Sequence, residues 1–392
     1  MGLLFSRYVH ERNDKKPHDH DDHLVPPSHR SGENKKYQFA RYLIAVGLLV
    51  LCTDAGAENL RIASFNTELQ RKGPGLLLRD IARGDDDQVM ATLRIITAAD
   101  ADIIALQSFD YDLTGEALSA YAQALAGMGL DYPFQFAARP NTGMPTGLDM
   151  DGDGHLGDPR DTQSYGQFSG QGGMAILSKF PIDYVALQDF SSTLWRDVPD
   201  AMLPYTDEGA FPSAAAQEIQ RLSTTGHWVV PIDVPKLGRV TLMTFHASPP
   251  VFDGPEDRNG KRNHDEIVFW QHYLDEAFGP APRERFVLLG DFNQDRRGGE
   301  GIKAAISSIL DDPRLQDPMP QSKGSVLVSG DPFDTVDWTD PEPGNLRVDY
   351  VLPSSDWRVL DSGVLWPDRA TELGEDAMLA SRHRLVWIDI TR

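Results

Sequence analysis

Apolar and polar residues alternate along the chain in short blocks, which predicts many short strands with few helices between them. Residues 88–99, 116–126 and 264–278 carry apolar side chains at helical spacing. The predicted strands are 60–65, 103–107, 174–177, 228–234, 240–246, 285–289, 349–352 and 385–390. This order of elements favours a layered, mixed α/β fold over a simple parallel sheet.

Two long stretches between these elements have the composition of loops. Residues 140–173 are rich in Gly, Asp and Pro, and residues 323–344 are rich in Gly, Asp, Pro and Thr. Loops of this length in a compact domain usually form a site or move. The pattern contains no internal repeat and no linker, so residues 58–392 are predicted to form one domain.

The first 57 residues differ from the rest of the chain. Residues 35–57 combine a basic start, the apolar run 42–52 and a small-x-small ending, which is typical of a secretory signal peptide. The apolar run is too short for an ordinary membrane anchor. We expect a mature chain that starts at Glu58, has no transmembrane helix and is periplasmic or secreted. Residues 1–34 are a polar, His-rich extension that is predicted to be disordered, and they suggest a start codon assigned too early.

Composition narrows the function further. The chain has 392 residues, a formal net charge of −22 and a single cysteine, Cys52. One cysteine excludes an intramolecular disulfide, and its place in the leader excludes thiol catalysis by the mature chain. The acidic charge opposes binding to long nucleic acids, although a local basic site can still bind a phosphate ester. The oligomeric state does not follow from the sequence.

Polar residues stand where several of the predicted strands end. They are Asn66 in Ser64-Phe65-Asn66, His246 in Phe245-His246-Ala247, Asp291 and Asn293 in Gly290-Asp291-Phe292-Asn293, Asp349 in Asp349-Tyr350-Val351-Leu352, and His383 in Ser381-Arg382-His383-Arg384. Each motif alone is weak, since Asn66 or Asn293 could simply shape a turn or a strand end. Their shared position at strand ends, where rigid scaffolds hold catalytic groups, points to one site.

This set resembles the endonuclease/exonuclease/phosphatase superfamily, and the resemblance extends to Gly173–Ile182 and to essentially all of residues 58–392. The resemblance implies a DNase I-like α/β fold, a four-layered sandwich of two mixed β-sheets flanked by helices, with the site at one end of the sheets. It also implies a phosphoesterase that cleaves phosphate mono- or diesters by attack of an activated water.

The resemblance implies a role for each motif. By position His383 is the general base, and an imidazole held by a carboxylate such as Asp349 suits that role. Asp291 and Asn293 are expected to place the attacking water. His246 and Asn66 are then expected to contact the phosphate.

Two positions depart from the family pattern. Ser108 stands where the family has a glutamate that binds the divalent cation, and Arg382 stands where it has an aspartate. The usual ligands for Mg²⁺ or Ca²⁺ are therefore missing. Three explanations stay open: Asp110 or Asp112 reaches the metal, Arg382 takes its place at the phosphate, or the chain binds phosphate esters without cleaving them. We favour the arginine, because its planar fork suits bidentate phosphate binding.

A basic cluster follows His246 in the chain. Arg258 and Arg262 stand in the segment 253–264, where they are candidates for binding substrate phosphate. A solvated loop leading into a helix explains the cluster equally well.

An acidic motif lies within the first long loop. Asp149, Asp151 and Asp153 imitate the opening of an EF-hand loop, but the twelfth position is Arg160 and no flanking helices are predicted. A calcium loop of another type, with Asp158 as a further ligand, and an ordinary acidic turn are both open.

Overall fold

The structure is a computed structural model that describes residues 59–339 and 341–392. The predicted signal peptide, Cys52 and the extension 1–34 lie outside the described residues. None of the described helices is both long and apolar enough to cross a membrane.

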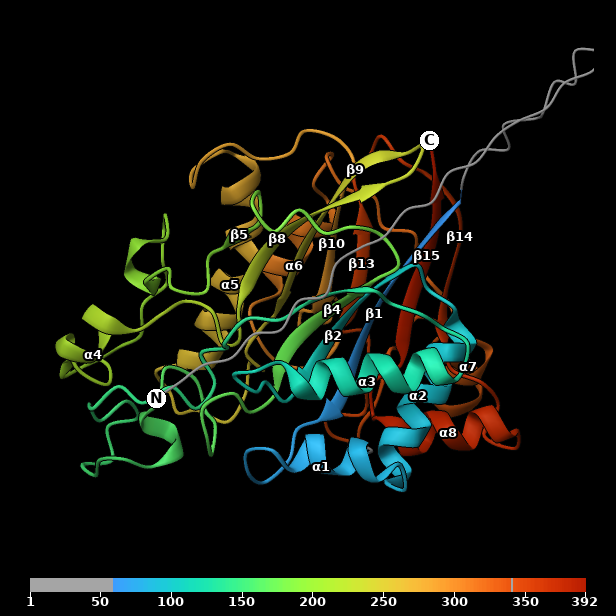
Figure 1. Cartoon of the computed structure of the whole chain (residues 1–392). Coiled ribbons are helices and arrows are strands. Elements are labelled where there is room, and N and C mark those ends of the chain that lie inside the picture. Colours follow the sequence, from blue (N-terminus) through green and yellow to red (C-terminus); the bar gives the residue numbers. More distant parts are fainter. Residues whose placement is uncertain (1–58, 340) are drawn as a thin grey trace, which may run out of the picture. The chain divides into compact units, whose positions relative to one another are not determined.

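Two mixed β-sheets form the centre of the described domain (Figure 1). The six-stranded sheet has the order β14 (Arg358–Leu365), β15 (Leu385–Thr391), β1 (Leu60–Leu69), β2 (Ile103–Phe109), β4 (Gly173–Ser178) and β3 (Phe134–Phe136). The five-stranded sheet has the order β13 (Asp349–Pro353), β10 (Phe286–Asp291), β9 (Gly238–His246), β8 (His227–Val234) and β5 (Gln188–Asp189). Two short pairs lie outside these sheets, β6 (Tyr205–Thr206) with β7 (Gly209–Ala210) and β11 (Val336–Asp337) with β12 (Asn345–Leu346).

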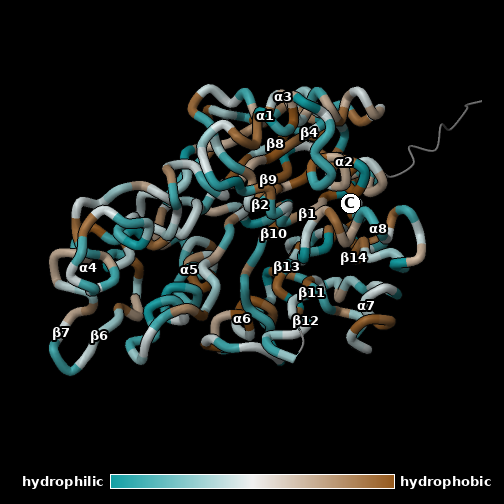
Figure 2. The backbone as a smooth tube through the Cα atoms, turned by 90° about the horizontal axis from the view of Figure 1, so that it is seen from below, coloured by the Kyte–Doolittle hydropathy of each residue, from teal (hydrophilic) through white to brown (hydrophobic). Residues whose placement is uncertain are grey.

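Helices cover the outer faces of both sheets (Figure 2). The six-stranded sheet is covered by α1 (Leu76–Arg83), α2 (Asp87–Ala99), α3 (Glu116–Gly127) and α8 (Glu372–Ala380). The five-stranded sheet is covered by α5 (Arg258–Leu274) and α6 (Lys303–Leu310). The remaining helical segments are η1 (Pro159–Asp161), η2 (Trp195–Asp197), α4 (Ala214–Ile219) and α7 (Lys323–Val328).

The period-2 alternation of strand residues produces three apolar layers. In β1, Ile62 faces the five-stranded sheet and Phe65 faces α2, because successive side chains of a strand point to opposite faces. The five-stranded sheet likewise packs Val287 between the sheets and Leu288 against Trp270 of α5. Helix, sheet, sheet and helix follow one another, and the predicted four-layered sandwich is confirmed.

Strand register brings polar residues that are distant in the sequence to one end of the five-stranded sheet. Asp291 of β10 is paired with His246 of the parallel strand β9. On its other side Asp291 is paired with Asp349 of the antiparallel strand β13. Three of the predicted site residues therefore stand next to one another on three neighbouring strands.

The start of one helix differs from the prediction. Helix α5 begins at Arg258 and ends at Leu274, whereas the sequence predicted residues 264–278. The interpretation of residues 253–264 as loop was therefore wrong from Arg258 onward. The segment contains Gly254, Pro255 and Gly260, which signal a turn, yet Gly260 lies inside the helix.

The two predicted loops also differ from each other. Residues 140–173 contain only the short η1 before β4 begins, so the prediction of a long irregular segment is confirmed there. Residues 323–344 contain α7 and β11, so the second segment is more ordered than its composition indicated.

Candidate active site

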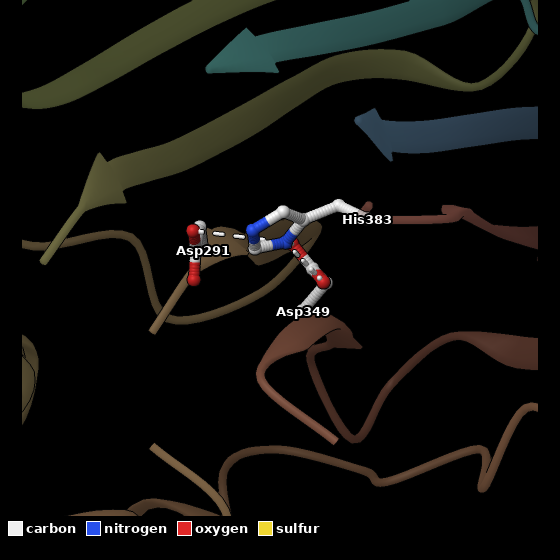
Figure 3. Close-up of side chains that lie close together, drawn as sticks. All are labelled: Asp291, Asp349 and His383. Atoms are coloured by element: carbon white, nitrogen blue, oxygen red, sulfur yellow. Dashed lines mark hydrogen bonds and ion pairs between the residues drawn. The ribbon is translucent and has the colours of Figure 1, made fainter. Parts of the chain in front are cut away.

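His383 lies between two buried carboxylates (Figure 3). Its Nδ1 atom is 3.0 Å from Oδ2 of Asp349, which also accepts a hydrogen bond from the Thr335 hydroxyl at 2.8 Å. Burial disfavours a charged imidazole, but Asp349 and Asp291 outweigh it and raise the pKa of His383 to about 9. Asp349 thereby fixes the tautomer of the ring, so that Nε2 is the nitrogen left to exchange a proton.

Asp291 connects the groups around it. Its carboxylate accepts hydrogen bonds from the Asn66 side-chain amide at 2.8 Å and from the Asn293 backbone N–H at 2.8 Å. Nε2 of His246 lies 3.3 Å from Oδ2 of the same carboxylate. Burial raises the pKa of Asp291, although His383 opposes the shift. The predicted residues Asn66, His246 and Asn293 are thus gathered around one acid.

His246 is turned toward this acid. Burial lowers the pKa of His246, which favours the neutral ring, although Asp291 opposes the shift. Its Nδ1 atom is buried and has no hydrogen-bond partner within the described part of the chain. Nε2 is therefore the ring nitrogen of His246 that faces Asp291.

The two asparagines reach the site from different sheets. Asn66 lies within β1, and its Nδ2 atom is 3.4 Å from Nε2 of His383. Asn293 follows β10 in the left-handed region, with φ of 49°, and its amide donates to the carbonyl of Ala247 at 2.9 Å. Hydrogen bonds between β1, β9 and β10 therefore fix the relative positions of the groups.

Arg382 is held by a residue that the sequence analysis missed. Nε of Arg382 donates to Oε1 of Glu68 at 2.9 Å, and the Arg382 backbone N–H donates to Oε2 at 2.8 Å. Burial alone would raise the pKa of Glu68, but its contacts with Arg382 lower it. The side chain of Arg382 remains 63% exposed, so its guanidinium is accessible from solvent. The motif Asn66-Thr67-Glu68 offered the signal, because Glu68 follows a site residue by two positions on the same strand.

The structure does not bring Asp110 or Asp112 to this site. The Asp110 carboxylate accepts hydrogen bonds from the backbone N–H groups of Arg71 and Gly172, each at 2.8 Å. Burial raises its pKa to about 6. Asp112 binds N–H groups at the start of α3, including that of Ala117 at 2.8 Å. Backbone N–H groups therefore occupy both carboxylates.

The site opens into a cavity of about 980 Å³. Asn66, His246, Asp291, Asn293 and His383 line it, as do Glu68, Ser108 and Arg382. The indole ring of Trp338 lies edge-on to the His383 ring, with 5.7 Å between the ring centroids. A cavity of this size accommodates a small organic ester.

The two basic candidates lie farther along the same cavity but differ in their contacts. Arg262 is buried and donates to backbone carbonyls, among them those of Leu222 at 2.7 Å and Ser223 at 3.0 Å. Arg258 makes one hydrogen bond, to the carbonyl of Met150. Both line the cavity, but Arg262 has most of its donors occupied by the protein.

The acidic loop forms a cluster of its own. Asp149, Asp151 and Asp153 each place one carboxylate oxygen within 4.8 Å of the others. Asp158 lies apart from the cluster, because it caps η1 and accepts from the Arg160 backbone N–H at 2.6 Å. Three of the four predicted ligands are therefore brought together.

Taken together, these elements define a two-sheet α/β sandwich with a histidine–carboxylate site at one end of its sheets. Residues 63–383 match the model of the Endonuclease/Exonuclease/phosphatase family, and the chain belongs to this family. The predicted resemblance is thereby confirmed.

Solved structures share the fold. An endonuclease/exonuclease/phosphatase from Beutenbergia cavernae is similar with a TM-score of 0.51 and 19% identity, over 85% of this chain and 71% of that chain. A family protein from Leptotrichia buccalis has a TM-score of 0.48 and 17% identity, over 85% and 100% of the two chains. A mannosyl-6-phosphatase from Bacteroides thetaiotaomicron has a TM-score of 0.48 and 16% identity, over 85% and 100%. A search of curated proteins found no match.

Divalent cations are common in this family, and the donor atoms present here fit such a cation poorly. Asp291, Asp349 and His383 place ligand atoms within 4.8 Å of one another, but their hydrogen bonds to protein groups already use these atoms. Ser108 supplies no carboxylate at the end of β2, and the Glu68 carboxylate is bound to Arg382. The residues at these positions therefore fit the cation of the family poorly.

Proposed function

We propose that the chain is an exported phosphoesterase that hydrolyses small phosphate esters with a water activated by His383. Members of its family are hydrolases. The observation that carries the proposal is the contact of His383 with Asp349, beside Asp291 and within the cavity. A histidine with a structural role alone would need neither a second buried carboxylate nor access to a cavity large enough for a substrate.

His383 acts as the general base in this proposal. A water between Nε2 and the phosphorus gives its proton to Nε2 as its oxygen forms the new P–O bond. The ester P–O bond on the opposite side breaks, and the leaving oxygen takes a proton from solvent. Asp349 stabilises the imidazolium that forms, while Asp291 and Asn293 orient the water.

Arg382 supplies positive charge at the phosphoryl oxygens. Phosphoryl transfer needs positioning and electrostatic stabilisation more than covalent chemistry from the protein. The Glu68 carboxylate holds the guanidinium in place, and the exposed fork binds two oxygens of the phosphate. His246 and Asn66 add neutral donors. The ion pair of Glu68 and Arg382 thus takes the place of a bound cation.

The substrate is a small ester outside the cytoplasm. The formal charge of −22 repels a long polyanion, whereas a small phosphate ester enters a local cavity without that penalty. The predicted signal peptide supports export to the periplasm or the medium. A secretion test with residues 35–57 fused to a reporter checks this part separately.

An assay of the mature chain tests the proposal. We expect p-nitrophenyl phosphate or its bis-ester to be hydrolysed equally well in EDTA, Mg²⁺ and Ca²⁺, and His383→Ala to remove the activity. Activity that requires a metal would reject the role of Arg382. Folded protein that cleaves neither ester nor a panel of other phosphate esters would favour phosphate binding without catalysis.

A further inference from the structure

Arg258 is a positive charge without a carboxylate partner in the cavity. It begins helix α5 and is partly buried, and its guanidinium makes one hydrogen bond, to the carbonyl of Met150. Burial lowers its pKa, which indicates that the charged form loses hydration there. A guanidinium has five N–H donors, so most of the Arg258 donors have no partner in the described part of the chain.

The other arginines along the cavity have partners within the protein. Arg160 lies 3.3 Å from Asp151, and Arg382 is bound to Glu68. Arg262 donates to several backbone carbonyls. Among the described arginines that line the cavity, Arg258 is the one that has no carboxylate partner and whose donors are not taken up by backbone carbonyls.

The acidic side chains around Arg258 do not fill this role. Oδ2 of Asp151 faces Arg160, and Oε1 of Glu256 accepts from the Gly254 backbone N–H at 3.1 Å. Asp253 accepts from the backbone N–H of Asn259. None of these carboxylates forms an ion pair with Arg258 in the described structure. Leaving a partly buried cation unpaired is unfavourable, and a bound anion removes that cost.

We propose that Arg258 binds a second anionic group of the substrate, so that the preferred substrate is a phosphate ester carrying a further phosphate or carboxylate. The inference rests on the proposed function, because it places one phosphate at His383 and the second group at Arg258 in the same cavity. The planar fork of arginine matches either oxyanion with two parallel hydrogen bonds. The exposed rings of Tyr165 and Phe252 also line the cavity and offer an apolar surface to the carbon skeleton between the two groups.

Matched pairs of esters test the second group. Fructose 1,6-bisphosphate is compared with fructose 6-phosphate, and 3-phosphoglycerate with glycerol 3-phosphate. We expect kcat/KM to be about 10- to 100-fold higher for the member with the second anion, since a hydrogen bond to a charged group is worth about one to two factors of ten. The pair with the larger ratio identifies phosphate or carboxylate as the preferred group.

Variants assign the effect to Arg258. Arg258→Met should lower the ratio within the preferred pair to about 1, and Arg258→Lys should leave an intermediate ratio, because it keeps the charge without the fork. Arg139→Met is the matched control, since Arg139 is exposed, bonds Ser169 at 2.9 Å and does not line the cavity. A ratio that stays high in Arg258→Met, or a wild-type ratio of about 1 in both pairs, overturns the proposal. If Arg258→Met does not fold, Arg258→Lys carries the test.

A binding measurement separates this proposal from the proposed function. In the His383→Ala protein, calorimetry should show fructose 1,6-bisphosphate binding that is about 10-fold weaker once Arg258→Met is added. If the wild-type protein cleaves no ester but its binding of fructose 1,6-bisphosphate depends on Arg258, the anion site is supported and the proposed hydrolase activity is rejected. If the protein cleaves esters but its binding of fructose 1,6-bisphosphate does not depend on Arg258, the anion site is rejected and the proposed hydrolase activity stands.

Discussion

The ends of the two sheets face the same cavity with different side chains. The five-stranded sheet presents His246, Asp291 and Asp349 from three adjacent strands; Nε2 of His246 lies 3.3 Å from Asp291, and Asp349 lies 3.0 Å from Nδ1 of His383. The six-stranded sheet and the segment before β15 present Glu68, Ser108 and the exposed Arg382. The five-stranded end therefore presents a histidine and two acids, whereas the segment before β15 presents both the ion-paired Arg382 and His383, which reaches across to Asp349.

The difference shows how one site combines preserved and altered parts. The acid–base groups depend on one another through short contacts, so a change at one of them leaves a buried charge unpaired. The pair of Glu68 and Arg382 lies at the surface of the cavity, where a charge is exchanged at lower cost. We therefore expect a substitution to cost less at the Glu68–Arg382 pair than at His383.

Removing the base should have the largest effect. His383→Ala is expected to lower kcat on p-nitrophenyl phosphate by about 10²- to 10⁴-fold, because the general base is lost. His272→Ala is the control, since His272 lies at the end of α5 and does not line the cavity. Activity within twofold of wild type in His383→Ala would show that the histidine held by Asp349 does not carry the chemistry.

Removing the fixed charge should have the next largest effect. Arg382→Ala is expected to lower kcat by about 10²- to 10³-fold through loss of electrostatic stabilisation. Arg283→Ala, at an 86% exposed side chain outside the cavity, should leave kcat unchanged.

A double variant sharpens the same comparison. Ser108→Glu with Arg382→Asp restores the two carboxylates of the family pattern, and its activity should require Mg²⁺ and disappear in EDTA. The single variant Arg382→Ala provides the opposing outcome. If it is as active as the wild type and still needs a metal, a group other than Arg382 supplies the positive charge at the phosphate.

The pH dependence should follow His383. The base works only without its proton, and its pKa is raised to about 9, so kcat/KM should rise about tenfold per pH unit below that value and level off above it. Asp349→Asn removes a charge that raises this pKa, so the residual activity should level off at a lower pH. Profiles of kcat/KM from pH 6 to 10.5 measure both. An inflection near 6.5 in the wild type would mean that the two carboxylates do not act on His383.

A buried asparagine should matter for stability at the five-stranded end. Asn263 on α5 donates to the carbonyls of Ser248 and Phe292, each at 2.8 Å, and so ties together the loops after β9 and β10. Asn263→Ala leaves both carbonyls unsatisfied and should lower the free energy of unfolding by about 2–4 kcal/mol in urea denaturation. Asn259→Ala, which loses one hydrogen bond to Val251, should cost about 1 kcal/mol.

The sequence was sufficient to predict the fold and the strand-end residues. His246, Asp291 and Asp349 could be found because each stands at the end of a buried strand. The ends of neighbouring strands lie side by side at one end of the sheet. Glu68 was missed because its role depends on Arg382, more than three hundred residues away, and on a left-handed backbone with φ of 48°.

The roles of Arg262, Asp110 and Asp112 were harder to predict from the sequence, because their partners are backbone groups. The partners of Arg262 are backbone carbonyls such as that of Gln163, which no side-chain pattern reveals. Asp110 and Asp112 bind backbone N–H groups of nearby turns. Backbone contacts of this kind depend on loop geometry, and a single sequence shows residue types only.

The smallest expected effect concerns the acidic loop, whose Asp151 lines the cavity at a distance from His383 in the sequence. If the cluster of Asp149, Asp151 and Asp153 binds Ca²⁺, we expect an affinity in the millimolar range of extracellular sites. Saturation by about 10 mM Ca²⁺ would then add about 1–3 kcal/mol and raise Tm by about 2–5 °C. Asp153→Asn removes one ligand charge and should abolish the shift, whereas Asp131→Asn on another loop should keep it. Activity should not change with Ca²⁺, because the cluster does not include the groups at His383. A Tm that Ca²⁺ leaves unchanged would identify the motif as an ordinary acidic turn, and activity that rises with Ca²⁺ in Asp153→Asn would place a cation at the sheet ends after all.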